Sequence, residues 1–378
     1  MGCIGLPTAC ILATSGYDVL GVDIDDKVIA QVLSVDLSDS EPNLKALLLE
    51  AIHCGHLKVS NKIAPADIHI VAVPTLVGLD NQPDISYVNA AIDNIKPYLR
   101  PKDLVIIEST CPIGTTEEIA HKLRDKYSDI RFAYCPERVL PGNILYELIH
   151  NDRVVGGVDD ESTLHAINFY KTFVKGNVFA TNSRMAEAVK LAENSYRDIN
   201  IAYANELSMI ASHVGLNVNE LIGLANGHPR VNILNPGPGV GGYCIAVDPW
   251  FLISSAPDLA IITSTARKIN TQKTDWVIKK VKEVIRKNNV SVVACLGLTY
   301  KSNTADIRQS PAVNVVNALE MEVKVLRVDP YVLDTTELYN ALARAEIIVG
   351  LVAHSAFMNI PPNYLVNKII LDFAGIFK

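Results

Sequence analysis

Short apolar runs alternate with longer amphipathic stretches in the first part of the chain. The apolar runs are Tyr17–Asp23, Ile68–Pro74, Leu104–Glu108 and Ile130–Tyr134. Continuous runs rich in β-branched residues, separated by helix-length segments, are typical of parallel strands that helices cover on both faces. The pattern therefore predicts a doubly wound, Rossmann-like α/β domain over residues 1–182.

The pattern changes after Asn182. Arg184–His213 contains neither proline nor glycine and predicts one continuous helix, about 45 Å long at 1.5 Å per residue. Further helices are predicted at Val218–Asn226, Pro249–Ala256 and Leu259–Asn288. We expect a central helical domain over residues 183–288. Because so long a helix needs an apolar partner, we also expect a homodimer or homotetramer.

Apolar runs return in the last part of the chain. They are Ser291–Leu298, Val323–Val328, Ile347–Val352 and Lys368–Asp372. These runs predict a second α/β domain over residues 289–378. The expected fold class is α/β, with two Rossmann-like doubly wound domains joined by a helical domain that contains the long central helix.

Composition excludes several classes of function. The 378 residues are 49% hydrophobic and 20% charged, which is typical of a multidomain globular protein. A net charge of −7 argues against a nucleic-acid partner. The sequence has no secretory signal and no apolar run of membrane-spanning length, so we expect no membrane association. Its seven scattered cysteines lack metal-ligand spacing, which predicts reduced thiols in the cytoplasm and no metal site.

A dinucleotide site is indicated near the N-terminus. Gly2 and Gly5 fit the second and third glycines of a G-x-G-x-x-G turn, and Asp23 lies 18 residues after Gly5, where a ribose-binding acid belongs. An acid there favours NAD over NADP, although Asp23–Asp26 also fits a solvated turn. Thr75 and Thr110 follow predicted strands, where α/β folds bind ligands. The first strand and first glycine of the motif do not precede Gly2, so we expect a domain that lacks its first strand.

The segment Asn235–Pro249 has the strongest chemical signal. Four glycines within residues 237–242 lead into Cys244, and Asp248 follows. Glycine allows positive φ angles and close approach of a ligand, so a thiol at the end of such a loop is placed for nucleophilic chemistry. The alternative is a tight connection that holds a buried, inert cysteine.

Polar residues elsewhere fit a phosphorylated sugar. Lys190, Asn194 and Arg197 have the spacing of one helix face, where they suit sugar and phosphate oxygens, although a solvated face would look the same. Further acidic and basic residues occupy expected loops. The basic ones suit a diphosphate, although they would look the same as ordinary surface charges. These residues are Glu137, Arg138, His228, Arg230, Lys301 and Arg308.

Together these segments resemble the UDP-glucose/GDP-mannose dehydrogenase family over nearly the whole chain. The similar stretches are Gly2–Pro7, Val71–Thr75, Glu108–Thr110, Cys135–Gly142, Glu193–Asn200, His228–Asn232, Gly237–Pro249 and Leu298–Lys301. The UDP-glucose branch carries Phe-Pro-Lys-Asp after the cysteine and Asn-Pro-Glu-Phe-Leu at the earlier loop. Because this chain has Ile245–Asp248 and Cys135–Val139 there, the resemblance favours the branch that oxidises UDP-N-acetyl-D-mannosamine.

The resemblance implies oxidation of the C6 primary alcohol of a UDP-sugar to a carboxylate, with two NAD⁺ and one water, through a cysteine thiohemiacetal and thioester. The implied catalytic residues are Cys244, Lys190, Asn194, Asp248, Glu137 and Thr110. The implied NAD-binding residues are Gly2, Cys3, Ile4, Gly5, Asp23, Thr75, Thr110 and Arg308. The implied UDP-sugar-binding residues are Arg138, Val139, Lys190, Asn194, Arg197, His228, Arg230, Gly241, Tyr300 and Lys301.

Other interpretations remain open from the sequence. Ala374 stands where the family tends to carry a basic residue toward the substrate. The enzyme could instead act on another nucleotide sugar, such as UDP-glucose, UDP-GlcNAc or GDP-mannose. A two-electron hydroxyacid-type dehydrogenase would share the Lys/Asn helix without needing Cys244. A UDP-sugar-binding protein impaired in NAD binding would follow from the lacking strand.

Overall fold

The long helix predicted from the sequence lies at the boundary between two compact units of the chain. The computed structural model describes residues 1–37, 41–78, 80–124, 129–140 and 142–377. One unit comprises Met1–Ala192 with Trp250–Ser255, and the other comprises Glu193–Pro249 with Ala256–Lys378. Helix α8 (Ser183–Val214) contributes to both units, which confirms one helix over Arg184–His213. Its 32 residues correspond to about 48 Å.

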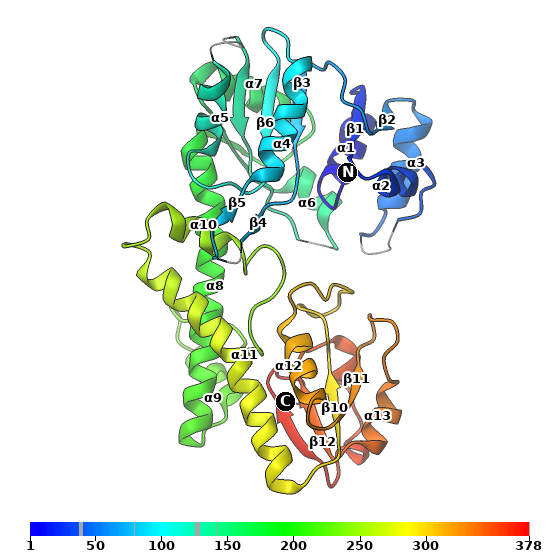
Figure 1. Cartoon of the computed structure of the whole chain (residues 1–378), viewed down its shortest axis with the longest axis vertical. Coiled ribbons are helices and arrows are strands. Elements are labelled where there is room, and N and C mark those ends of the chain that lie inside the picture. The colour runs from blue at the N-terminus through cyan, green and yellow to red at the C-terminus, as the bar shows by residue number, and fades with distance from the viewer. Residues whose placement is uncertain (38–40, 79, 125–128, 141, 378) are drawn as a thin grey trace. The chain divides into compact units, whose positions relative to one another are not determined.

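The first unit alternates strands and helices, in the blue to green part of the ribbon in Figure 1. Its elements before α8 are α1 (Gly5–Thr14), β1 (Val19–Val22), α2 (Asp26–Leu33), α3 (Leu44–His53), β2 (Leu57–Ser60), β3 (Ile68–Val71), β4 (Leu76–Val77), β5 (Pro83–Asp84), α4 (Ser86–Ile95), η1 (Lys96–Tyr98), β6 (Leu104–Ile107), α5 (Thr115–Leu123), β7 (Arg131–Tyr134), α6 (Ile144–His150), β8 (Arg153–Gly157), α7 (Asp160–Tyr170) and β9 (Val178–Asn182).

Strand β6 is buried along its whole length in the main sheet of this unit, whose strand order is β3-β6-β7-β8-β9. Successive strand residues point to opposite faces. Val105 and Ile107 accordingly pack in a cluster with α4 and α5, whereas Leu104 and Ile106 pack in a cluster with α1 and α7. Helices on both faces explain why the sequence of β6 is apolar throughout.

The sheet departs from the expected parallel arrangement at one strand pair. Strands β7 and β8 are antiparallel, with Ala133 opposite Gly157, whereas β3–β6, β6–β7 and β8–β9 are parallel. Helix α6 ends at His150, only a short step before Arg153 begins β8. The chain therefore returns to the sheet edge beside β7 without a crossover, which reverses the direction of the next strand.

Strands β1 and β2 form a separate parallel ladder. They pack with α1, α2 and α3 around Leu6, Cys10, Leu48 and Leu57. Within the described residues, β1 pairs with β2 and β3 pairs with β6, so the two ladders are not hydrogen-bonded to each other.

The second unit contains α9 and α11, followed by an α/β domain. Its elements after α8 are α9 (Val218–Ala225), α11 (Ile261–Asn288), β10 (Val292–Leu296), α12 (Pro311–Glu320), β11 (Lys324–Val328), α13 (Leu338–Arg344), β12 (Ile347–Gly350), η2 (Ser355–Phe357), η3 (Pro362–Tyr364) and β13 (Ile369–Asp372). Helix α10 (Asp248–Ser255) begins in this unit and continues into the first.

The sheet of the second unit is parallel and has the strand order β11-β10-β12-β13. Helices α11 and α12 cover one face, and α13 covers the other. Because the strand order reverses at β10, the loops after β10, β11 and β12 meet at a topological switch point, where α/β sheets bind ligands. The three strands end level, since Leu296 lies opposite both Val328 and Gly350.

Candidate active site

The start of α1 and the end of β1 form the predicted NAD-binding end of the first unit. Helix α1 begins at Gly5 and carries no acidic residue in its first turn. The N–H groups at its start carry a partial positive charge, and no side-chain carboxylate in the first turn neutralises it, so this end of α1 suits a pyrophosphate. Gly2, an exposed residue, has open space where a Cβ would stand. Cys3 is exposed and Ile4 is the N-cap.

Asp23 follows β1 directly, as the sequence predicts for a ribose-binding carboxylate. Its Oδ2 accepts a hydrogen bond from the Met1 backbone nitrogen at 2.8 Å, and its Oδ1 accepts one from Asp25 N at 3.0 Å. Partial burial opposes ionisation, but these donors hold the pKa of Asp23 below its usual value. The side chain is therefore an anion, and with the open glycine turn it fits NAD better than a phosphorylated ribose.

Thr75 and Thr110 follow the paired strands β3 and β6. The hydroxyl of Ser109 links the two strand ends, since it donates to Val73 O and accepts from Val73 N, both at 2.8 Å. Both threonines are half-buried. The fold thus brings them to the same edge of the first unit's sheet.

Glu137 is the centre of a polar cluster within the first unit. Its Oε1 accepts a hydrogen bond from Arg138 N at 2.6 Å, and its Oε2 pairs with Arg153 Nη1 at 3.1 Å. Lys190 Nζ donates to the backbone oxygen of Glu137 at 2.6 Å. Residues predicted separately, Glu137 and Lys190, therefore lie in contact, and Val139 instead packs against an apolar cluster with Ile144.

Arg153 is a functional candidate that the sequence interpretation missed. Its side chain is 3% exposed, and the guanidinium also donates to Leu148 O at 3.1 Å. Beyond it, Tyr170 donates to Glu108 Oε1 at 2.7 Å, and burial raises the pKa of Glu108 to about 7 despite the nearby Arg153 charge. The sequence contained one signal for this role, because Arg153 directly precedes two valines and two glycines. An arginine that is buried with such a segment needs a charged or polar partner.

Asn194 and Asp248 meet within the second unit. The Asn194 side-chain nitrogen lies 2.5 Å from Asp248 Oδ2, and both side chains are buried. The two residues are far apart in the sequence, so this contact comes from the packing of α8 against the start of α10. Arg197, one turn further along α8, is exposed.

Cys244 opens the helical turn that leads into α10. Its carbonyl oxygen accepts hydrogen bonds from Asp248 N at 2.9 Å and Val247 N at 3.1 Å, and the residue is exposed. The alternative of a buried, inert thiol is therefore wrong for Cys244, whereas Cys10, Cys111, Cys135 and Cys295 are buried.

Both ends of the glycine-rich loop are anchored by polar groups on α8 and α11, of which Asn205 and Arg267 are buried. At the first end, Gly237 N donates to Asn205 Oδ1 at 2.9 Å, and Thr274 Oγ1 donates to Pro238 O at 2.9 Å. At the second end, Arg267 Nη1 donates to Ala246 O at 3.0 Å. The loop is thus held on either side of Cys244.

The anchoring groups form one buried network. Arg267 Nε lies 3.0 Å from Asp198 Oδ2, and Asn270 Nδ2 donates to Asp198 Oδ1 at 2.7 Å. Asn205 Nδ2 in turn donates to Asn270 Oδ1 at 2.9 Å. Burial raises the pKa of Asp198 to about 6, against the lowering effect of Arg267.

The glycines of the loop allow close packing against Tyr300. An added Cβ at Gly241 would stand 2.9 Å from Tyr300 Cβ and 2.5 Å from Gln309 O. Gly242 has a φ of +80°, and a Cβ there would meet the Tyr300 ring at 2.8 Å. The structure thereby brings the predicted substrate residues Gly241 and Tyr300 together.

The remaining predicted residues of the second unit lie on exposed loops. Arg308 pairs with Asp306 at 2.5 Å and covers the ring of Tyr243, and Gly242 N donates to its backbone oxygen. Lys301 is exposed, as are His228 and Arg230, which follow α9. Arg308 thus lies beside the cysteine loop of its own unit.

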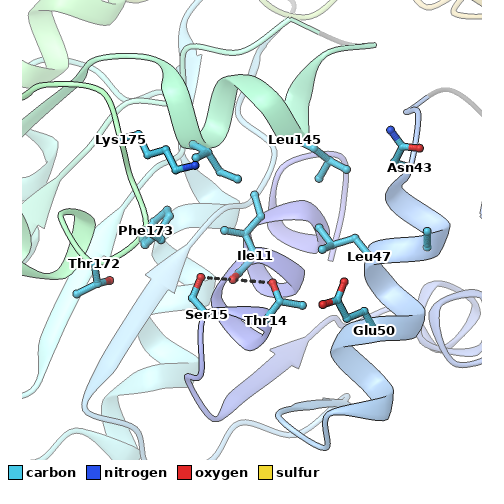
Figure 2. Close-up of a pocket in the computed structure, with 12 residues that line it drawn as sticks. Ile11, Thr14, Ser15, Asn43, Leu47, Glu50, Leu145, Thr172, Phe173 and Lys175 are labelled. Carbon is cyan, nitrogen blue, oxygen red and sulfur yellow. Dashed lines mark hydrogen bonds between the residues drawn. The ribbon is translucent and has the colours of Figure 1, made fainter.

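The pocket in Figure 2 lies at the other end of α1 from Gly2 and Gly5. It measures about 520 Å³ and is lined by Ile11, Leu47 and Phe173, among others. Thr14 and Ser15 point their hydroxyls at helix carbonyls, which leaves them bonded within α1. Among the described residues that line it there is no predicted site residue.

Across the described ranges, no group of His, Cys, Asp or Glu side chains has the arrangement of a metal site. In the same part of the chain, no helix has the length and apolar character needed to cross a membrane.

Three domain profiles match the chain in sequence order. They describe the NAD binding domain of the UDP-glucose/GDP-mannose dehydrogenase family at residues 1–174, its central domain at 184–272 and its UDP binding domain at 294–378. The chain belongs to the UDP-glucose/GDP-mannose dehydrogenase family.

Individual members of this family are similar over the whole chain. A UDP-N-acetyl-D-mannosamine dehydrogenase of Methanocaldococcus jannaschii is 46% identical, covering 100% of this chain and 91% of that protein. An NDP-N-acetyl-D-galactosaminuronic acid dehydrogenase of Ralstonia solanacearum is 43% identical, covering 100% and 95%. The solved UDP-D-ManNAc dehydrogenase of Pyrococcus horikoshii has a TM-score of 0.94 at 38% identity, covering 100% and 94%.

The family assignment connects the two sheets to their ligands. The NAD binding domain match contains Gly2, Asp23 and Thr110, and the UDP binding domain match contains Tyr300 and Lys301. The family resemblance and the α/β fold class expected from the sequence are therefore confirmed.

The buried Asp198–Arg267 pair gives a first prediction. Arg267→Met removes the cation and its bonds to the cysteine loop, and it leaves the Asp198 carboxylate buried without its partner. We expect the free energy of unfolding to fall by about 3–5 kcal/mol, measured by urea denaturation. Arg286→Met, which breaks an exposed pair with Glu322, is the matched control and should change it little. Equal losses in both variants would contradict an anchoring role for Arg267.

Proposed function

We propose that this chain oxidises the C6 primary alcohol of UDP-N-acetyl-D-mannosamine to the carboxylate, with two NAD⁺ and one water. The observation that carries the proposal is the exposed Cys244 at the start of a helical turn, in a glycine-rich loop anchored on both sides. Such an anchored thiol suits covalent chemistry on a substrate carbonyl.

The reaction needs a nucleophile because it removes four electrons from one carbon. Bound NAD supplies the hydride acceptor for each two-electron oxidation. The first two-electron oxidation converts the C6 alcohol into an aldehyde. The sulfur of Cys244 then adds to the aldehyde carbon and forms a C–S bond. The product is a thiohemiacetal, whose carbon still carries one hydrogen. Loss of that hydrogen as hydride, together with the proton of the thiohemiacetal hydroxyl, leaves a thioester. Water then breaks the C–S bond, which releases the acid and returns the thiol.

The charged and amide groups have complementary roles in this proposal. Lys190 exchanges the alcohol proton and stabilises oxyanions with its ammonium. Asn194 and Asp248, which contact each other, orient the oxyanion and the hydrolytic water. Glu137 and Thr110 assist the water and its protons, and Arg153 fixes the Glu137 carboxylate.

Binding roles follow the family's domain order. The start of α1, Asp23 and Thr75 bind NAD, with Cys3, Ile4 and Arg308 contributing contacts. The UDP-sugar is bound by cations and loop groups, namely Arg138, Val139, Arg197, His228, Arg230, Gly241, Tyr300 and Lys301. Ala374 stands where the family tends to carry a basic residue, so this position supplies no cation to a substrate anion in the proposal. The names of the relatives in Methanocaldococcus jannaschii and Pyrococcus horikoshii support an N-acetylmannosamine substrate.

The domain boundaries, the oligomeric state and the location in the cell complete the proposed function. We divide the chain into domains at residues 1–182, 183–288 and 289–378. Tyr196, Tyr203 and Ile210 are exposed at seven-residue intervals along α8, which supports self-association into a homodimer or homotetramer. Seven scattered cysteines without metal-ligand spacing, together with the two metabolite ligands, support a cytoplasmic location.

The proposed stoichiometry gives the second prediction. The unaltered enzyme should form two NADH per UDP-N-acetyl-D-mannosamine consumed, and Cys244→Ser should lower acid formation by roughly 10³-fold or more, because the thioester cannot form. NADH absorbance and anion-exchange chromatography of the sugar nucleotide measure both quantities. UDP-glucose, UDP-N-acetylglucosamine, UDP-N-acetylgalactosamine and GDP-mannose complete the substrate panel.

Cys54→Ser is the matched control, because Cys54 is also exposed but lies at the end of α3, outside the proposed site. It should retain activity. One NADH per sugar with release of free aldehyde, or full activity of Cys244→Ser, would support a two-electron dehydrogenase instead. UDP binding without NAD binding in calorimetry would support a binding protein.

Cofactor choice gives the third prediction. Asp23→Ser removes the carboxylate that repels a 2′-phosphate, so the preference for NAD over NADP in kcat/KM should fall about tenfold or more. Asp18→Ser, which alters an exposed aspartate just before β1, should leave the preference unchanged. An unchanged preference in Asp23→Ser would remove Asp23 from the cofactor site.

A further inference from the structure

A buried Asp–His pair lies at the switch point of the second unit's sheet. Asp329 directly follows β11, and His354 follows β12, on either side of the loop that leaves β10. His354 Nε2 lies 3.0 Å from Asp329 Oδ2, and both side chains are 0% exposed. The reaction proposed above gives neither residue a role.

This pair holds the β10 loop through its backbone. Asp329 Oδ2 accepts hydrogen bonds from Leu298 N at 2.7 Å and Thr299 N at 3.3 Å, at the start of the loop. His354 Nδ1 accepts one from Asn303 N at 2.9 Å, at its far end. Tyr300 and Lys301 lie between these clamped positions.

The hydrogen bonds define the state of the imidazole. Nδ1 accepts from a backbone N–H, so it carries no proton, and the ring proton is on Nε2. Thr299 Oγ1 donates to Lys301 O at 2.8 Å, so at 3.2 Å from Nε2 it acts as a second acceptor. Burial opposes ionisation of Asp329, but the donors from His354, Leu298 and Tyr331 hold its pKa below the usual value. A neutral His354 therefore bridges a carboxylate and a backbone N–H.

Asn303 extends the clamp to the β12 loop. It adopts a left-handed conformation with a φ of 57°. Its Oδ1 accepts from Ser355 N and Ser355 Oγ, both at 3.0 Å. Tyr331 and Phe357 pack their rings against His354. The far end of the β10 loop is thus fixed from several directions.

The clamped loop also contacts the cysteine loop, because Tyr300 packs with its Cβ against Gly241 and with its ring against Gly242. We propose that His354 and Asp329 are positioning residues: the neutral imidazole, bridging Asp329 and the Asn303 N–H, holds Tyr300 and Lys301 in the geometry that binds the UDP part of the substrate. This inference rests on the proposed function for the UDP contacts.

Two near-isosteric variants separate the two arms of the bridge. His354→Asn keeps an acceptor at the Nδ1 position for Asn303 N–H but loses the donor to Asp329. His354→Gln keeps a donor near the Nε2 position but loses the acceptor for Asn303. In both variants Asp329 Oδ2 keeps the hydrogen bonds from Leu298 N and Thr299 N. Loss of the bond to Asn303 N–H is therefore the change that releases the loop.

The test is calorimetric titration of the full chain with UDP and, separately, with NAD⁺. His354→Gln should weaken UDP binding about tenfold, the size expected for loss of one buried hydrogen bond, and His354→Asn should weaken it less than about threefold. NAD⁺ affinity should stay unchanged in both variants. His213→Gln, at the exposed end of α8, is the surface control and should bind both ligands normally.

The outcomes separate this inference from the proposed function. Equal UDP affinity in the unaltered chain and both His354 variants would overturn the positioning role alone. Parallel loss of UDP affinity, NAD⁺ affinity and thermal midpoint in both variants would show a purely structural role and also overturn it. Failure of the unaltered chain to bind UDP would overturn the proposed function and this inference together.

Discussion

The ion pair between Asp198 and Arg267 is the contact on which the geometry of the cysteine loop (residues 237–246) depends. It joins α8 to α11, and the same guanidinium reaches the backbone just after Cys244. Charges are costly to bury unless every lone pair and proton is used. Here the side-chain amide of Asn270 donates a hydrogen bond to the second carboxylate oxygen of Asp198. Asn205 donates to Asn270 and accepts from Gly237 N, so it connects this pair to the loop. The loop is therefore fixed by polar contacts that exist only in one arrangement of the two helices.

A second constraint acts at the strand ends. Parallel strands that end level bring their following loops to one edge, so groups distant in the sequence become neighbours. In the second unit this places Asp329 beside His354, whereas in the first unit the antiparallel pairing of β7 with β8 brings Glu137, which follows β7, beside Arg153 at the start of β8. In both cases a buried side chain holds a neighbouring group in place: Arg153 holds the Glu137 carboxylate, and His354 holds the loop backbone at Asn303.

Much of this arrangement follows from the sequence, and the part that does not has a physical reason. The apolar runs predicted β1, β3, β6, β7 and β10–β13, because a short run rich in apolar and β-branched residues is a signal that the local sequence carries by itself. Strands β2, β8 and β9 were not identified, since β2 and β9 contain polar residues and β8 has only Val154 and Val155 between an arginine and two glycines. The contacts of Arg153, Arg267 and His354 were also missed. Each partner lies on another element, so the pairing exists only after packing.

The glycines before Cys244 show how the structure changes a sequence interpretation. The sequence suggests that they give the loop freedom to approach a ligand. The structure shows a different reason for glycine at positions 241 and 242, because a Cβ at either position would overlap Tyr300. Gly242 also requires positive φ. These glycines thus make the loop fit closely against a clamped neighbour, and since both ends of the loop are hydrogen-bonded to helices, close packing rather than mobility orients the thiol.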